Sequence, residues 1–505
     1  MIDDYSLMEG GFLVWFGNAP PQHAYLESWI CGAVSIAVYV AKTIRWTGIS
    51  AILDVNLIAN AYRDFYLAPD TYYVAYRAFL TAIDLFTAVL VYFLARDVLR
   101  GDRNNYWPVM VAVLYLFSYN TYWVNLVGRP DTLTAFFTVL GVSLYLRSGP
   151  RTDSPFFWGA AAALGCAAGL KLHGSFTVIF LALERIRSKG LKDGMKAAMV
   201  LGSVSVLFFL LADGSLLFDP LKYVKARWLT SQHDRYTWIH WGNQVVEVLR
   251  GSGWISAFLV FASPIFWYFR KEPMEEKSRI VAFLAAGWIV LFLCIRQLRA
   301  YWMLPALPMI YITSVSLASR IRPAFIARGL AVIMILFSFT QSIAMAADLR
   351  RNDLDELRRW IRGNVSVQDP FFIIGYEVVQ LPRNSRCLAN ISEMIHRSIE
   401  KDRASGIDFT RRHLKNWEEE SVLRLIDMLG GASDGYEYYS SFLHPEIEER
   451  GLDKMNYVII QDTLYRNLQE HVKELVRQRF AFLGRFTGPG GDGTGLQYSV
   501  YQRRS

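Results

Sequence analysis

Long apolar runs alternate with short charged loops through residues 1–346 of the chain. Most runs approach the length of about 20 residues with which an α-helix crosses a bilayer. This pattern predicts a bundle of transmembrane helices rather than one large soluble core. The expected spans are 71–95, 106–126, 131–147, 156–170, 173–184, 195–212, 254–269, 279–295, 302–319 and 326–346.

Two stretches of this region are less regular. Residues 1–70 form an expected first outer loop with juxtamembrane helices. Within it, 23–44 holds a short apolar run broken by Glu27 and Gly32, which fits an interfacial or re-entrant helix as well as a span. The loop 213–253 is rich in Trp, Tyr and His, which predicts helices lying on the membrane surface.

Residues 347–505 have the mixed polarity of a soluble domain. A helix is expected to start at Asp353 or Asp355 and to end near Gly363. Short buried strands are expected at 371–375 and 457–460, an amphipathic helix at 411–431, and two final strands joined by a glycine-rich turn within 480–503. The predicted fold class is therefore mainly α: a polytopic transmembrane helical bundle, 1–346, followed by a small α/β domain.

Composition and charge fit this division. The chain is 53% hydrophobic and carries a net charge of +8. Its excess of Lys and Arg falls in alternate short loops, which the positive-inside rule places in the cytoplasm, so the charge gives no reason to expect a nucleic-acid partner. These loops are 96–103, 147–151, 185–196, 270–279 and 320–328. The remaining loops, 127–130, 171–174, 213–253 and 296–301, and the soluble tail are then extracytoplasmic.

The four cysteines give no sign of a special chemistry. Cys31, Cys166, Cys294 and Cys387 are scattered and form no CxxC pair. Their spacing predicts neither a disulfide framework nor a zinc site.

Charged and polar residues gather on the predicted outer face. Charges near a bilayer are costly and are usually tied to function or to a partner. A set of carboxylates and cations suits transfer from a phosphate-linked donor, because cations neutralise the departing phosphate while a carboxylate takes a proton from the attacking group. The candidates are Asp3, Asp4, Glu9, Arg129, Asp131, Lys171, His173, Arg296, Arg299 and Tyr301.

Each candidate also has a purely structural interpretation. Arg129 and Asp131 can form an interfacial ion pair at a helix start. Lys171 can extend its amine to the membrane surface, and His173 can be a packed, hydrogen-bonded side chain. Asp4 and Glu9 can be solvated. The candidates gain weight together, because the topology rule places them on the same side independently of their chemistry.

Four short motifs at these positions resemble those of the polytopic glycosyltransferases of the GT-C class. The likeness is to the protein O-mannosyltransferase (family 39) and lipid A aminoarabinose transferase group, and it extends over nearly the full length. Asp4 stands where that group has Glu, and one extra residue separates Arg299 from Tyr301. The motifs are Asp3-Asp4-Tyr5, Arg129-Pro130-Asp131, Gly169-Leu170-Lys171 and Arg299-Ala300-Tyr301-Trp302-Met303-Leu304-Pro305.

The resemblance implies inverting transfer of a sugar from a polyprenyl-phosphate carrier to a lipid, glycan or protein acceptor on the extracytoplasmic side. Asp3 takes the role of general base, and Asp131 assists the acceptor. Lys171, Arg296, Arg299 and Tyr301 bind the donor phosphate, with Arg129, His173 and Glu9 in support. No cofactor is required, although Asp3 and Asp131 could hold a divalent metal.

Family members begin with a span that delivers the acidic pair to the outer face, so we expect such a span to be missing before Asp3. Two other classes of function compete with the enzyme. A transporter or flippase also carries charges in its membrane domain, but usually at the midplane and with internal repeats, which this chain lacks. A non-catalytic membrane scaffold would not need the carboxylates and cations together.

Overall fold

The computed structural model describes part of the chain, and the structural statements below concern that part. It comprises residues 25–47, 57, 60–61, 64–65, 69–99, 106–118, 120–121, 124, 131–213, 241–270, 275–294, 300–350, 353–374, 381, 384, 435–440, 452–465, 468, 470–487 and 497–504.

The described residues fall into two compact units. The membrane unit consists of His23–Ser28 and Arg77–Ala344. The tail unit takes in Met345–Ser505 and also Trp29–Tyr76, of which the part up to residue 70 was predicted within the first outer loop.

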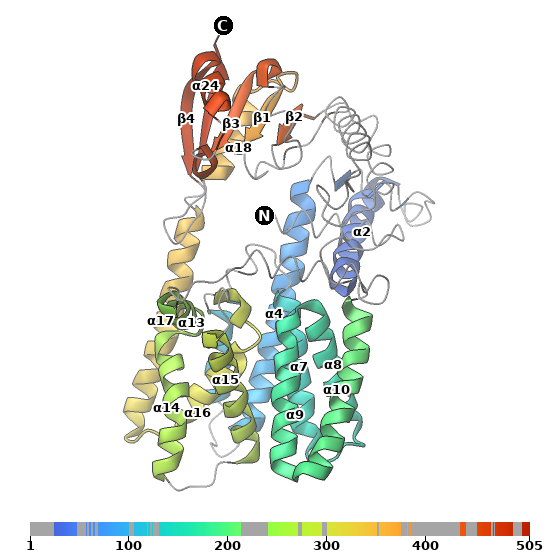
Figure 1. Ribbon diagram of the computed structural model, residues 1–505, viewed down its shortest axis with the longest axis vertical. Coiled ribbons are helices and arrows are strands. Elements are labelled where there is room, and N and C mark those ends of the chain that lie inside the picture. The colour runs from blue at the N-terminus through green and yellow to red at the C-terminus, as the bar shows by residue number, and fades with distance from the viewer. Residues whose placement is uncertain are drawn as a thin grey trace. The chain divides into compact units, whose positions relative to one another are not determined.

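Most predicted spans are helices in the structure (Figure 1). Within the described ranges, five helices are long and apolar enough to cross a membrane, and a bent pair makes a sixth possible span. The predicted mainly α membrane fold is confirmed, and the chain is an integral, multi-pass membrane protein. The five are in α2 (Tyr25–Thr47), α4 (Pro69–Val98), α10 (Leu191–Asp213), α15 (Glu276–Cys294) and α17 (Ala324–Arg350).

Two predicted spans are shorter helices than expected. The run 106–126 forms α5 (Tyr106–Leu116) and then turns. The turn is held by hydroxyls, since Ser118 Oγ and Thr121 Oγ1 lie 2.8 Å apart and Thr121 Oγ1 donates to the Tyr115 carbonyl at 2.8 Å. The run 302–319 begins in the 3-10 turn η4 (Ala300–Met303), and α16 (Leu307–Ala318) follows it with a proline in its first turn.

Four helices, α7 to α10, form a tight group in the membrane unit (Figure 1). Glycines let α8 and α10 approach closely: a Cβ on Gly165 would lie 2.4 Å from the Ser205 carbonyl oxygen, and one on Gly169 would lie 2.7 Å from Ala212 Cβ. Small residues of this kind are what allow close helix packing in membranes. The helices are α7 (Asp131–Ser148), α8 (Pro155–Leu170), α9 (Ser175–Lys189) and α10.

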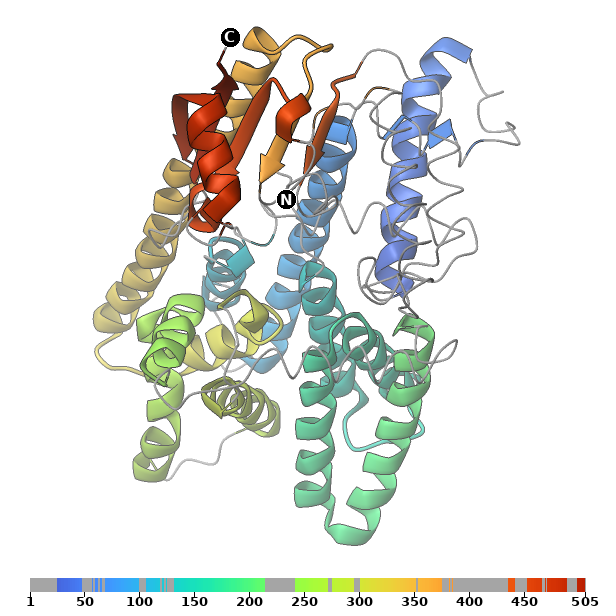
Figure 2. The same cartoon turned by 45° about the horizontal axis from the view of Figure 1, so that its top comes forward.

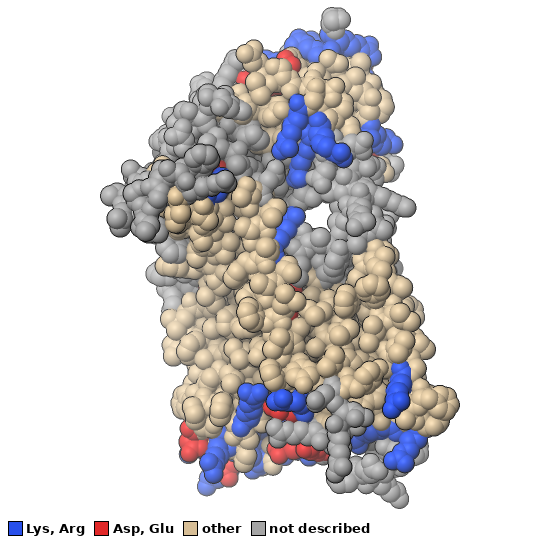
Figure 3. Space-filling model, turned by 180° about the vertical axis from the view of Figure 1, so that it is seen from behind, with Lys and Arg blue, Asp and Glu red and all other residues tan. Residues whose placement is uncertain are grey.

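Basic residues gather at one end of the membrane unit, below a broad uncharged surface (Figure 3). Contacts join the ends of several helices there: Arg147 Nε lies 3.4 Å from Asp97 Oδ2, and Arg279 lies 3.9 Å from Glu184 Oε1. Arg185, predicted at the start of the loop 185–196, lies within the helix α9 instead. Its side chain is 3% exposed, and its guanidinium lies 4.6 Å from the Tyr145 ring centroid.

One helix, α13 (Trp241–Ser252), is described within the predicted loop 213–253. It meets α14 (Trp254–Arg270) at a bend of 100°. Gly253, with φ of +80°, makes this bend in a backbone conformation that favours glycine. Asn120 Nδ2 donates to the Gly251 carbonyl at 3.2 Å and ties the bend to the segment that follows α5.

The tail unit contains a five-stranded sheet of order β2-β1-β3-β5-β4 (Figure 2). β1 pairs in parallel with β2 and β3, while β5 pairs antiparallel with β3 and β4. The two predicted strands and the closing strand pair are confirmed, and the predicted helix 411–431 lies outside the described residues. The strands are β1 (Phe371–Ile374), β2 (Tyr438–Ser440), β3 (Tyr457–Gln461), β4 (Phe480–Thr487) and β5 (Gln497–Arg503).

Both faces of this sheet are covered, because alternate strand residues point to opposite sides. Phe371 and Ile373 share a core with Leu357 of α18 (Asp353–Asn364), the helix predicted at this position. Phe372 and Ile374 share the other core with α24 (Glu470–Arg479). The predicted small α/β domain is therefore confirmed.

Candidate functional site

Asp131 is the first residue of α7 and its side chain is fully buried, with 0% exposed. The preceding proline favours an extended residue before it, which places the helix start here. An acidic side chain in the first turn suits the positive end of the helix dipole. Asp131 is therefore a buried carboxylate at the end of α7 that lies opposite the basic end of the membrane unit.

The turn between α8 and α9 brings two more candidates to the same end. Lys171 leaves the helix in an extended conformation, and its N–H donates to the Ala167 carbonyl at 3.1 Å. The 3-10 turn η2 (Leu172–Gly174) follows at once. A Cβ on Gly174 would lie 2.6 Å from the Ala167 carbonyl oxygen, so only glycine lets the turn fold back this closely.

His173, in the middle of that turn, packs between two tryptophans. Its ring is stacked on Trp302 at 5.7 Å with an interplanar angle of 9°, and it meets the edge of Trp288 at 6.1 Å. Trp288 belongs to α15 and donates its Nε1–H to Thr177 Oγ1 of α9 at 3.1 Å. Trp302 belongs to η4, directly after Tyr301, so η4 is brought against the α8–α9 turn.

Described residues of three predicted motifs lie near His173. Burial lowers the pKa of His173 to about 4; the negative charge of Asp131 opposes this shift and the positive charge of Lys171 adds to it. The histidine is neutral at pH 7. Because both charges act on the ring, the first turn of α7, the α8–α9 turn and η4 form one local cluster, which we call the Asp131 cluster: Asp131, Lys171, His173 and Trp302.

The other candidates are not placed. Asp3, Asp4, Glu9, Arg129, Arg296 and Arg299 lie outside the described residues. Tyr301 lies in η4 by its backbone, while its side chain is not described.

One polar residue next to this cluster was missed by the sequence reasoning. Asp84 lies within the apolar helix segment Thr71–Val98, and its side chain is 1% exposed. It accepts a hydrogen bond from the Tyr115 hydroxyl at 2.8 Å and a longer one from Thr132 Oγ1 at 3.4 Å. A lone carboxylate inside a predicted span is a recognised sign of function, and that signal was available in the sequence.

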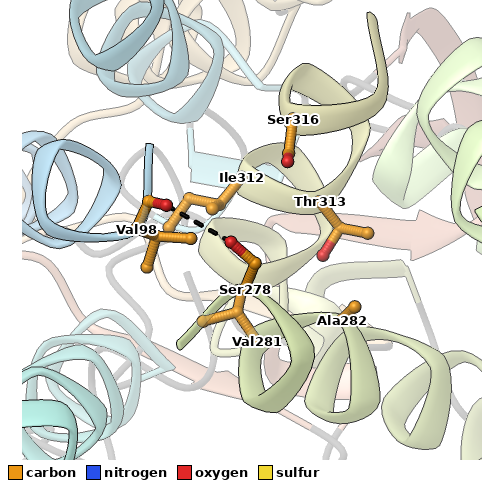
Figure 4. A pocket seen from close by; sticks show the side chains of 7 residues that line it. All are labelled: Val98, Ser278, Val281, Ala282, Ile312, Thr313 and Ser316. Atoms are coloured by element: carbon orange, nitrogen blue, oxygen red, sulfur yellow. Dashed lines mark hydrogen bonds between the residues drawn. The ribbon is translucent and has the colours of Figure 1, made fainter. Parts of the chain in front are cut away.

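The described part of the chain offers no metal site near these residues. No three His, Cys, Asp or Glu side chains gather there in an arrangement that could hold a metal ion. A small recess lies between α4, α15 and α16, lined by Val98, Ser278, Val281, Ala282, Ile312, Thr313 and Ser316 (Figure 4).

The hydroxyls of this recess already have partners. Ser278 Oγ donates to the Val98 carbonyl at 3.3 Å, and Thr313 Oγ1 donates to the Met309 carbonyl at 2.8 Å. Val98 and Ser278 also lie at the basic end, away from Asp131. The recess is therefore a packing feature between helices.

No family model matches the chain, and no curated protein matches it. Among solved structures, the chain is similar to ArnT from Cupriavidus metallidurans bound to undecaprenyl phosphate, with 11% identity and a TM-score of 0.45 over 85% of this chain and 83% of that one. It is also similar to the apo state of the same protein, with 9% identity and a TM-score of 0.43 over 83% of each chain. Both structures are of a lipid A aminoarabinose transferase, the group that the motifs resemble.

Proposed function

We propose that the chain is an inverting glycosyltransferase that moves a sugar from a polyprenyl-phosphate carrier to an acceptor on the extracytoplasmic side of the membrane. The observation that carries the proposal is the Asp131 cluster. Described residues of three motifs that are far apart in the sequence lie together at the end of the membrane unit opposite its basic loops. A buried carboxylate, an amine and a neutral imidazole lie together there.

The reaction needs a base and a positive environment. The acceptor loses a proton to a carboxylate as its oxygen or nitrogen attacks the anomeric carbon of the sugar. The bond between that carbon and the phosphate oxygen breaks, and the phosphate leaves with the electron pair. Nearby cations stabilise the charge that develops on the phosphate.

We assign these tasks to the predicted residues. Asp3 is the general base, an assignment supported by sequence alone, and Asp131 orients the acceptor. Lys171 binds the donor phosphate together with Arg296 and Arg299, because an amine supplies a point charge and a guanidinium binds phosphate oxygens in a fork.

His173 contributes as a neutral hydrogen-bonding group. Its Nε2 is buried and has no hydrogen-bond partner among the described residues. A buried ring nitrogen without a partner is costly, and an oxygen of the bound donor would satisfy it. The stacked Trp302 fixes the plane of the ring and excludes water from one of its faces.

The basic loops support an extracytoplasmic orientation for the site and for the tail. The positive-inside rule places the end that carries Arg147, Arg187 and Lys189 in the cytoplasm. Asp131 starts the helix that ends near Arg147, so it faces the opposite side. Cysteine substitution at exposed Lys192 and labelling of intact cells with a membrane-impermeant reagent tests this: labelling at this position from outside would contradict the orientation.

The function is tested with membranes that contain the chain and a panel of radiolabelled polyprenyl-phosphate sugars. We expect one donor to lose its label to an acceptor. Asp3→Asn is expected to abolish this transfer while expression stays normal, and Asp153→Asn, at an exposed position of the basic end, is the matched control. Movement of the intact labelled carrier across the bilayer without loss of label would instead indicate a flippase. If no donor in the panel loses its label, the proposal is contradicted.

A further inference from the structure

A buried carboxylate lies inside a membrane helix behind the Asp131 cluster. Asp84 belongs to α4, and only 1% of its surface is exposed. A carboxylate in the hydrocarbon region is strongly unfavourable unless partners compensate for its lost hydration. Helix formation does not explain Asp84, because Leu and Ala favour a helix more strongly than Asp does.

The partners of Asp84 come from two other helices. The Tyr115 hydroxyl of α5 donates to Oδ1 at 2.8 Å, and the Thr132 hydroxyl of α7 donates to Oδ2 at 3.4 Å. Each carboxylate oxygen therefore accepts from a different helix. The segment that carries Tyr115 is itself fixed, because Thr121 Oγ1 donates to the Tyr115 carbonyl.

Thr132 is the residue directly after Asp131, in the first turn of α7. The first N–H groups of a helix have no partner within the helix, so the first turn is where a helix frays most easily. A side-chain bond from Thr132 to a rigid partner on α4 restrains this turn. The direction of the Asp131 carboxylate depends on the same turn.

We propose that Asp84 is a positioning residue of the candidate site, which fixes the first turn of α7, and with it Asp131, through the hydroxyls of Thr132 and Tyr115. Its catalytic consequence rests on the proposed function, whereas its effect on α7 does not. An aspartate is required because its two oxygens accept both hydroxyls. An asparagine offers one oxygen and one N–H₂ group, so one hydroxyl would lose its acceptor.

The test that is independent of activity is hydrogen exchange of the full chain in detergent micelles. For Asp84→Asn, we expect exchange of the amides at 135–138, which bond to the carbonyls of the first turn, to become about tenfold faster, with exchange at 139–146 unchanged. Asp97→Asn is the matched control, since Asp97 is a buried carboxylate of the same helix that pairs with Arg147 at the basic end. Unchanged exchange at 135–138, or equal acceleration along all of α7, would overturn the proposal.

The kinetic test separates positioning from loss of fold. We expect Asp84→Asn to lower kcat by about 10- to 100-fold with little change in KM for the donor, because small misplacement of a reacting group has effects of this size. Thr132→Val should lower kcat by a similar factor, whereas Thr132→Ser, which keeps the hydroxyl, should have nearly wild-type activity. The Asp84→Asn/Thr132→Val double variant should be little worse than either single variant.

Additive losses in the double variant, or a loss that Thr132→Ser does not rescue, would overturn the positioning role. If the wild-type chain transfers no sugar, the proposed function fails, and the exchange measurement still decides the role of Asp84.

Discussion

Replacing Arg185 with alanine should strongly destabilise the membrane unit. The guanidinium lies 4.6 Å from the Tyr145 ring centroid and 5.6 Å from that of Phe157, and it donates to the Gly149 carbonyl at 2.5 Å. With its side chain 3% exposed, these contacts are sheltered from water. They join the end of α9 to α7, α8 and the loop between them.

The magnitude follows from those contacts. A desolvated cation–π contact contributes about 2 kcal/mol, and a hydrogen bond from a charged donor about 1.5–3 kcal/mol. Relief of the cost of burying the guanidinium offsets part of the loss. We therefore expect Arg185→Ala to lower the free energy of unfolding by about 2–4 kcal/mol. Arg185→Lys should lower the free energy of unfolding by less than Arg185→Ala does, because an amine keeps the charge but not the planar stacking.

Denaturant unfolding in detergent micelles, followed by tryptophan fluorescence, measures these differences. Arg187→Ala is the matched control, because Arg187 lies on the same helix with its side chain 54% exposed and 3.8 Å from Glu184 Oε1. Glu184 is buried, but it keeps Arg279 at 3.9 Å when the exposed Arg187 is removed, so Arg187→Ala should cost at most about 1 kcal/mol. Equal effects of Arg185→Ala and Arg187→Ala would refute the reasoning.

Three further predictions test the packing and the chemistry of the site. Gly165→Ala should destabilise the chain by about 1–3 kcal/mol through overpacking, whereas Gly202→Ala, where an added Cβ meets nothing within 4 Å, should be neutral or slightly stabilising; equal thermal shifts would contradict this. The pKa of His173 in the folded state, about 4, lies below its ordinary value of 6.5, so the folded state binds fewer protons and stability should fall as the pH drops from 6.5 towards 4. His173→Phe should flatten that dependence in thermal scans, and an unchanged slope would argue against a buried neutral ring. Trp302→Ala should reduce sugar transfer severalfold while Trp254→Ala, at a 57% exposed position, leaves it intact; similar losses in both would exclude a specific role for the stack.

The membrane helices could be predicted well because length and hydropathy alone define them. The run 131–147 became α7 (Asp131–Ser148), and 254–269 became α14 (Trp254–Arg270). Helix ends were harder to predict where hydrogen bonds of side chains, rather than a change in hydropathy, end the helix. The predicted span 106–126 turns after Leu116 because hydroxyls of Ser118 and Thr121 bond locally, which apolar periodicity does not report.

The site was predicted in part, and for a physical reason. The topology rule assigns each loop to a side of the membrane, so it placed Asp131, Lys171 and His173 on one face. The rule does not say which helices are neighbours within the membrane, so it could not show that Trp302 stacks on His173 or that Thr132 lies beside Asp84. The loop that holds Arg185 was predicted to start too early, because the charge pattern marks the end of an apolar run and not the end of its helix, α9.

The most direct test of the central claim uses purified chain in lipid nanodiscs with a radiolabelled undecaprenyl-phosphate sugar. For Asp131→Asn, we predict that release of the sugar to the acceptor falls by at least about 100-fold, because an amide cannot replace the carboxylate at a reacting group. Binding of undecaprenyl phosphate should stay within about twofold, since cations rather than Asp131 hold the phosphate. A wild-type rate of transfer in Asp131→Asn would contradict a catalytic role for the Asp131 cluster.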